Sequence, residues 1–274
     1  MVSPSAPISC NAMPRSDSKT EMTNRRWMQR LRGKWLLMLA ALPSCVLAGP
    51  PFRTDDPAVV EYKHFELIAF YQQSLAGGGR SGVMPGFEFH YGAFDKVELD
   101  LVTPFAFNSP SAASTERGYG DTELGVKYRL IEETDSMPLV SFTPLLDLPT
   151  GNSGRGLGNG GSAVFLALSL QKSWRDLQSY GEIGYWINNG ANNRNYWFVG
   201  WQAQFQFSAN WVLGAEIFRT TPRMIGEGAS TGFNVGGSYV IDARNQLLFS
   251  GGKGLQNAAQ TNGVSTYVGY QLSY

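Results

Sequence analysis

The sequence predicts an all-β protein, a transmembrane up-and-down antiparallel β-barrel of outer-membrane type with about 12 strands. Three observations lead to this fold. Segments with alternating apolar and polar side chains recur from residue 62 onward, the connections between them alternate between short and long, and the chain ends on an amphipathic strand. Neither convincing helical periodicity nor an apolar run of membrane-helix length follows residue 48.

Residues 1–48 are expected to be a signal peptide that is removed. A basic block precedes the apolar run 35–42, and small or β-branched residues at 46–48 suit a signal peptidase that cleaves after Ala48. Met22 and Met28 are alternative start sites. A membrane anchor is disfavoured because the run is well short of the roughly 18 residues that a spanning helix needs. Lipid attachment at Cys45 is disfavoured by Pro43.

The remaining chain is cysteine-free and mildly acidic. The leader contains Cys10 and Cys45, together with seven of the 22 basic and two of the 22 acidic residues, so the formal charge becomes about −5. This composition excludes a disulfide scaffold. It also argues against nucleic acid as a partner, which requires clustered basic charge.

Residues 49–61 are expected to form a periplasmic N-terminal segment and residues 62–274 the barrel. The expected strands are, approximately, 62–74, 84–93, 97–107, 120–131, 138–149, 162–173, 179–188, 195–207, 210–220, 231–241, 245–253 and 264–274. Short turns such as 94–96 and 208–209 alternate with mostly longer loops such as 75–83 and 150–161, which is typical of outer-membrane barrels.

Several strands separate charged and apolar side chains onto opposite faces. Between residues 97 and 107, for example, Leu99 and Leu101 oppose Glu98 and Asp100. An ionised carboxylate in contact with lipid costs several kcal/mol, so the charged rows are expected to face the interior. The facing of segments 138–149, 162–173 and 245–253 stays open. Pro144 within the first of them predicts a β-bulge.

Aromatic residues gather near strand ends, as they do in the interfacial girdles of membrane barrels. The alternative is the general preference of aromatic residues for strands. The expected girdle tryptophans are Trp174, Trp186, Trp197, Trp201 and Trp211.

The last strand places Tyr270, Leu272 and Tyr274 on its outer face and polar residues on the other. An ending on an aromatic residue resembles the signal that the barrel assembly machinery reads. The expected partners are therefore this machinery and outer-membrane lipid, and the expected location is the bacterial outer membrane.

Specific motifs add a family resemblance. They are 49–57 (GPPFRTDDP), 119–128 (YGDTELGVKY), 149–151 followed by 156–160, 192–201 (NNRNYWFVGW) and 230–237. Together they resemble the family named for a MetA pathway of phenol degradation, whose members are often labelled transporters. The resemblance implies an outer-membrane barrel connected with aromatic-compound catabolism, and it brings no catalytic motif.

A mixed-charge patch is expected on one wall of the lumen. It is either a polar constriction that lines a channel or a network of ion pairs that fills a narrow barrel. Its members from the first four strands are Glu66, Glu88, His90, Glu98, Asp100, Glu123, Lys127 and Arg129, and Glu182 and Glu216 extend it.

Catalytic and metal-binding motifs are not recognisable. His64 and His90 are the only histidines, and each is followed two positions later by a residue, Glu66 or Gly92, that is not the serine of outer-membrane phospholipases. Two isolated histidines make a poor zinc site. The glycine-rich run 156–161 lacks the lysine of a phosphate loop. We expect no enzyme activity, no cofactor and no metal.

The entry segment leaves two alternatives. Asp55 and Asp56 either contact a divalent ion or form a solvated turn before Pro57, and the second is preferred. The segment either stays outside the barrel or folds into its periplasmic mouth as a plug.

The best interpretation is a passive outer-membrane channel for small, aromatic or hydrophobic compounds. The alternatives are a closed structural or adhesion barrel and, less favoured, a lipid hydrolase. Substrate identity and oligomeric state are not predicted.

Overall fold

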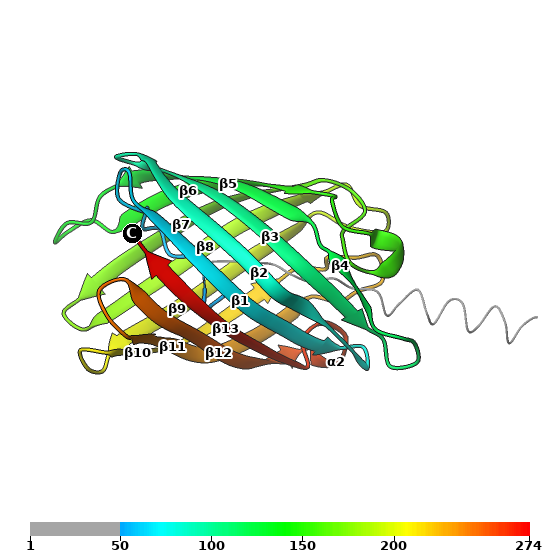
Figure 1. Ribbon diagram of the computed structural model, residues 1–274. Helices are drawn as coiled ribbons and strands as arrows, with labels where there is room; N and C mark the ends of the chain where they lie inside the picture. Colours follow the sequence, from blue (N-terminus) through cyan, green and yellow to red (C-terminus); the bar gives the residue numbers. More distant parts are fainter. Residues whose placement is uncertain (1–49) are drawn as a thin grey trace, which may run out of the picture. The chain divides into compact units, whose positions relative to one another are not determined.

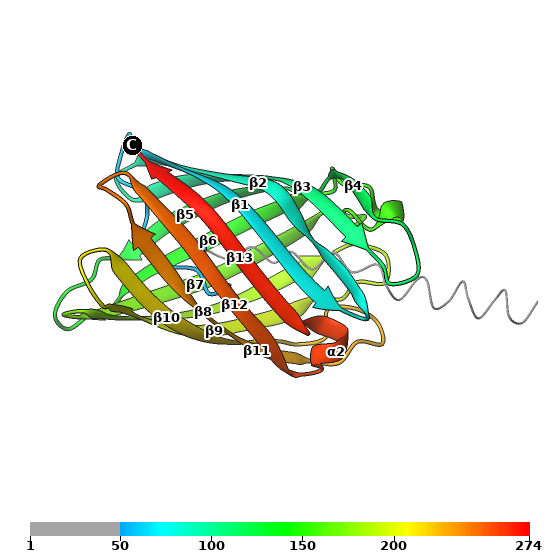
Figure 2. The ribbon, with the colours of Figure 1, turned by 60° about the horizontal axis from the view of Figure 1, so that its bottom comes forward.

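The computed structural model describes residues 50–274, in which antiparallel strands close into a barrel (Figures 1 and 2). The expected signal peptide lies outside the described residues. The strands are β1 (Phe65–Ala76), β2 (Gly79–Phe94), β3 (Val97–Ser109), β4 (Glu116–Tyr119), β5 (Thr122–Ile131), β6 (Leu139–Leu148), β7 (Ala163–Trp174), β8 (Leu177–Asn188), β9 (Tyr196–Gln206), β10 (Trp211–Thr220), β11 (Ser230–Val240), β12 (Asn245–Gln256) and β13 (Val264–Ser273).

The thirteen strands occupy twelve positions around the barrel, as the sequence predicts, because β4 and β5 lie end to end in one position. Both pair with β3, and only residues 120–121 separate them. The sheet closes where β1 pairs with β13 as well as with β2. Closure leaves no open sheet edge, which is the condition for a sheet to sit in hydrocarbon.

The first hairpin differs from the prediction. The sequence predicts a long loop over residues 75–83, but β1 and β2 continue to Ala76 and Gly79 and are joined by Gly77 and Gly78 alone. Both glycines have positive φ, 59° and 78°, which suits a tight two-residue turn. The polar residues that suggested a loop extend the strands at the end where the other long loops lie, such as 149–162 and 221–229. The remaining connections alternate as predicted.

Alternation of burial resolves the three strands whose facing the sequence leaves open. The inner row of β6 includes Ser141 and Thr143, that of β7 includes Ala163 and Phe165, and that of β12 includes Leu248 and Gly254. The outer rows are apolar and exposed, as lipid contact requires. They include Leu146, Leu166, Leu168, Leu170 and Leu247.

The predicted bulge at Pro144 is wrong. The pairs Gly125–Leu145 and Tyr128–Phe142 keep one register across it, and the irregularity between β5 and β6 lies at Arg129 and Ile131 instead. Thr143 and Pro144 have no paired residue on β5. This interruption of the pairing accommodates proline, which lacks a backbone N–H, and neither strand needs the extra residue of a bulge.

Helical structure is limited to two short pieces in the described chain, the 3-10 turn η1 (Ser153–Arg155) and α2 (Ala258–Thr261). Between residues 50 and 274, no helix is long and apolar enough to cross a membrane.

Candidate functional site

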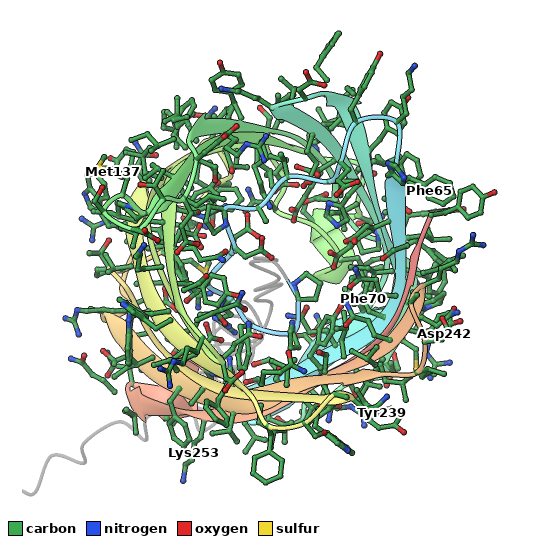
Figure 3. The ribbon with its side chains drawn as sticks, turned by 90° about the vertical axis from the view of Figure 1, so that its left-hand side faces the viewer. Phe65, Phe70, Met137, Tyr239, Asp242 and Lys253 are labelled. Carbon is green, nitrogen blue, oxygen red and sulfur yellow. The ribbon has the colours of Figure 1, made fainter. Side chains whose placement is uncertain are left out.

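The chain before β1, residues 50–64, enters the barrel. Residues 50–57 are buried or half-buried, whereas residues 61–64, next to β1, are exposed. The segment forms no strand and follows the inner face of the wall, where it is the pale blue trace of Figure 3. Of the two alternatives for the entry segment, the structure therefore has the one in which it enters the lumen. Phe52 and Thr54 are buried there.

Glu216 on β10 holds the start of this segment. Its carboxylate accepts hydrogen bonds from the backbone N–H groups of Arg53 (2.9 Å) and Thr54 (2.9 Å) and from the Thr54 hydroxyl (3.0 Å). Asn234 on β11 donates to the same carboxylate, and Gln202 on β9 donates to the Thr54 carbonyl oxygen (3.0 Å). A buried carboxylate with this many donors keeps its charge solvated by the protein.

Asp55 continues the contact across the lumen. Its backbone N–H donates to Glu182 on β8 (2.6 Å), and its side chain pairs with Lys127 on β5 (3.1 Å). Lys127 also lies 3.5 Å from Glu98 on β3. Burial raises the pKa of the Asp55 carboxyl to about 7, because loss of hydration outweighs the attraction of Lys127. The contacts with Lys127 and Glu182 place Asp55 inside the barrel and not in a solvated turn.

The segment leaves the lumen along β2 and β3. The Val60 N–H donates to Glu98 (2.6 Å), and the Lys63 N–H donates to the Gly92 carbonyl oxygen (2.8 Å). Gly92 has no room for a side chain, since a Cβ would lie 2.0 Å from the carbonyl oxygen of Glu61. Residues 50–64 therefore contact β2, β3, β5, β8, β9 and β10, and also β12, where the Ser250 hydroxyl donates to the Pro51 carbonyl oxygen.

His90 is surrounded by carboxylates. Its ring nitrogens lie 2.7 Å from Asp100, 3.5 Å from Glu98 and 3.5 Å from Glu88. Its ligand atoms and those of Glu98 and Asp100 fall within 4.8 Å of one another, the one such group among residues 50–274. Lys127 beside Glu98 and a protonated His90 would supply positive charge to these carboxylates, so the group does not require a metal.

The ten residues of the predicted patch all lie on inner rows, but they do not form one cluster. Lys127, Glu98, Glu182 and Glu216 contact the entry segment or its anchors. Glu66 accepts hydrogen bonds from Gln271 and Ser273 near the β1–β13 closure. Arg129 donates to the Asp95 carbonyl oxygen in the β2–β3 turn. The Glu123 side chain on β5 has no ion pair among the described residues, and its Oε2 has no hydrogen-bond partner.

A row of stacked aromatic rings lies on the inner faces of β7, β8 and β9. The Trp186 ring on β8 stacks on Phe165 of β7 (centroids 4.7 Å apart) and on Tyr196 of β9 (6.0 Å). Phe198 and Phe218 belong to the same buried cluster. Phe165 lies flat over Gly184, where a Cβ would be 2.2 Å from the ring. We call Phe165, Trp186 and Tyr196 the aromatic ladder.

The ladder corrects one prediction. Trp186 is 5% exposed and faces inward, so its assignment to an interfacial girdle is wrong. The signal was present in the sequence, because Trp186 is four positions from Glu182 and therefore on the same face of its strand. Trp174, Trp197, Trp201 and Trp211 are exposed on the outside.

The 119–128 motif ties the barrel to the long loop 149–162. The Asp121 carboxylate accepts hydrogen bonds from the backbone N–H groups of Gly151 (2.8 Å) and Asn159. Leu157 of that loop is buried and packs over Gly118 and Gly120. Asp121, which sequence reasoning did not single out, therefore holds this loop against the mouth of the barrel.

Comparison with known structures agrees with an outer-membrane channel fold. The "COG4313 outer membrane channel from Pseudomonas putida F1" superposes with a TM-score of 0.62 at 18% identity, over 80% of this chain and 98% of that one. The NanC porin gives 0.53 at 8% identity, over 77% and 98%. The "KdgM porin in complex with disordered oligogalacturonate" gives 0.52 at 12% identity, over 76% and 99%. No curated protein matches the sequence.

The family resemblance is confirmed. Residues 76–272 match the family described as "Putative MetA-pathway of phenol degradation". The chain belongs to this family and has the closed, twelve-stranded antiparallel barrel of outer-membrane channels and porins.

Proposed function

We propose that the protein is a passive channel in the bacterial outer membrane for small aromatic or hydrophobic compounds. The aromatic ladder carries this proposal. Three neighbouring strands each contribute one large ring, Phe165, Trp186 or Tyr196, to a stack on the inner face of the barrel. Planar rings of permeants can stack on such a wall.

Charged side chains share the lumen with these rings. Glu98, Lys127 and Glu216 lie on inner rows and contact the entry segment. A lumen with apolar and ionic surfaces suits amphipathic aromatic molecules such as phenols better than it suits purely apolar ones. No nucleotide-binding motif is recognisable in the sequence, so movement would follow the concentration gradient.

The entry segment would set the width of the passage. Its contacts with Glu216, Glu182 and Glu98 are noncovalent, so its undocking can open the lumen without any change in the barrel. The same contacts favour the second candidate, a closed structural barrel that the segment fills permanently. The two candidates differ in whether small molecules cross.

The proposal also includes an outer-membrane location, the assembly machinery and lipid as partners, and the lack of enzyme activity. The leader supports the proposed export, the aromatic C-terminal residue Tyr274 supports assembly by the barrel assembly machinery, and the exposed apolar rows support contact with outer-membrane lipid. His90 is bonded to carboxylates and not to a hydroxyl nucleophile, which disfavours lipid hydrolysis.

Uptake by intact cells tests the channel. A deletion strain complemented with the wild-type gene should accumulate labelled phenol faster than the same strain complemented with Trp186→Ala, at equal amounts of heat-modifiable folded barrel. Equal rates in the deletion and complemented strains, across a panel of phenols and hydrocarbons, would contradict the channel and favour the closed barrel.

A further inference from the structure

A buried carboxylate, Glu123, and a half-buried one, Asp147, face each other without an ion-pair partner. Glu123 on β5 is directly opposite Asp147 on β6. Glu123 is 6% exposed, and its Oε2 and Asp147 Oδ1 have no hydrogen-bond partner. Neither side chain forms an ion pair within residues 50–274. The other charged groups that interact with Glu123 are the acids Glu88 and Asp121.

The pairing of Glu123 with Asp147 is costly. Like charges directly opposite on neighbouring strands destabilise a sheet, and a buried acceptor without a partner loses its hydration for nothing. The inner carboxylates of Glu216, Glu182 and Glu98 differ, since the first two bind the entry segment and Glu98 is beside Lys127. A positively charged ligand or a bound proton would therefore stabilise Glu123 and Asp147.

The aromatic ladder adjoins this pair. Asp147 pairs with Ala163 on β7, which belongs to the same buried cluster as Phe165 and Trp186. Leu145, two positions before Asp147 on the same face, packs against that cluster. A paired carboxylate beside stacked rings is the combination that binds an organic cation, whose charge meets the oxygens while its ring meets the rings.

We propose that Glu123 and Asp147 form a binding subsite for small aromatic ammonium ions. The ammonium group donates to the two carboxylates, and the ring lies against the aromatic ladder. The subsite rests on the proposed channel function and deepens it, because it makes the passage prefer cationic aromatic compounds over neutral and anionic ones of the same size.

Binding to the full-length protein, folded in detergent, tests this directly. Benzylammonium chloride, benzyl alcohol and sodium benzoate are titrated at pH 7 by calorimetry. The wild type should bind benzylammonium at least about tenfold more tightly than benzyl alcohol, which is the effect of a charge-assisted hydrogen bond. The double variant Glu123→Gln/Asp147→Asn should lose this difference.

Glu66→Gln is the matched control, because Glu66 is also an inner carboxylate but already accepts hydrogen bonds from Gln271 and Ser273. It should leave the preference unchanged. Folding of each variant is checked by its heat-dependent mobility on a gel. Equal affinity of the wild type for the three compounds, or a preference that survives the double variant, would overturn the subsite in favour of a carboxylate pair that shares a proton.

Planar-bilayer recordings separate the two proposals. A protein that conducts but shows no preference for benzylammonium refutes the subsite and keeps the channel. A protein that binds benzylammonium but never conducts refutes the channel and keeps the subsite.

Discussion

Thr54 occupies the space that a side chain on Gly200 would need. A Cβ at Gly200 would lie 2.2 Å from Thr54 Oγ1. Gly200 is on the inner row of β9, beside Phe198 and Gln202. The absence of a side chain there makes room for the entry segment, so the barrel wall and the segment are complementary in shape.

Gly200→Ala should therefore displace the segment and leave the barrel intact. An added methyl group at 2.2 Å cannot be accommodated without movement of Thr54, and docking weakens by about 1–3 kcal/mol. Limited proteolysis of the folded protein should cleave residues 50–61 faster in the variant. The control is Gly181→Ala on β8, where a Cβ would meet only ordinary contacts at 3.6 Å; equal cleavage of the two variants would contradict the close fit.

Removal of the Glu216 carboxylate should weaken docking of the same segment, because its hydrogen bonds with Arg53 and Thr54 are lost. Glu216→Ala leaves the Arg53 and Thr54 N–H groups without their acceptor, at a cost of about 1–3 kcal/mol for buried groups. The mean open fraction in single-channel recordings should rise at least severalfold. Glu116→Ala is the control, because its exposed carboxylate pairs with Arg155 and not with the segment. An unchanged open fraction would show that Glu216 does not hold the segment.

Docking of the segment should also depend on pH through Asp55. Because burial raises its pKa to about 7, ionisation of Asp55 costs more in the docked segment than in the free one. Docking is therefore strongest well below pH 7 and weakens as pH rises from about 4 toward 7. The groups that face Asp55 are Lys127, Glu98, Glu182 and Asp56. Proteolysis of the segment should become faster between pH 5 and 7.5, and Asp55→Asn should flatten this rise; a rise of the same size in that variant would assign it to another group.

Sequence periodicity predicted the barrel and its two faces because a strand repeats every two residues and lipid excludes charge. Glu98, Lys127 and Glu216 could be assigned to the inner row from this rule alone. Residue type alone predicts Trp186 at the membrane interface, but its spacing of four positions from Glu182 puts it on the inner face of the same strand. The first hairpin was misplaced because strands that extend beyond the lipid lose their apolar row, and Arg80 and Ser81 then resemble a loop.

The path of the entry segment could not be predicted in the same way. It has no repeating pattern, and its anchors are distant in sequence, since Arg53 and Glu216 are 163 positions apart. The use of Glu182 and Glu216 as acceptors for backbone N–H groups depends on this path. The sequence could identify these carboxylates as inward-facing but not their partners.

The outer surface should behave as a lipid-facing one. Leu168 is near the centre of β7 and Trp174 at its end, on the same exposed face. Leu168→Arg should lower the free energy of unfolding in lipid vesicles by about 2–4 kcal/mol, and Trp174→Arg by only about 0–1 kcal/mol, because the cost of a charge falls toward the interface. Urea unfolding followed by tryptophan fluorescence measures both. Equal losses would mean that depth in the membrane does not govern this face.

The most direct test of the channel is the planar-bilayer conductance of the folded barrel with and without residues 50–61. If the barrel encloses a passage that the segment narrows, the shortened chain should conduct in discrete steps several times larger than those of the full chain. A shortened chain that folds, shifts on heating like the wild type and still carries no current would contradict the channel and establish a closed structural barrel.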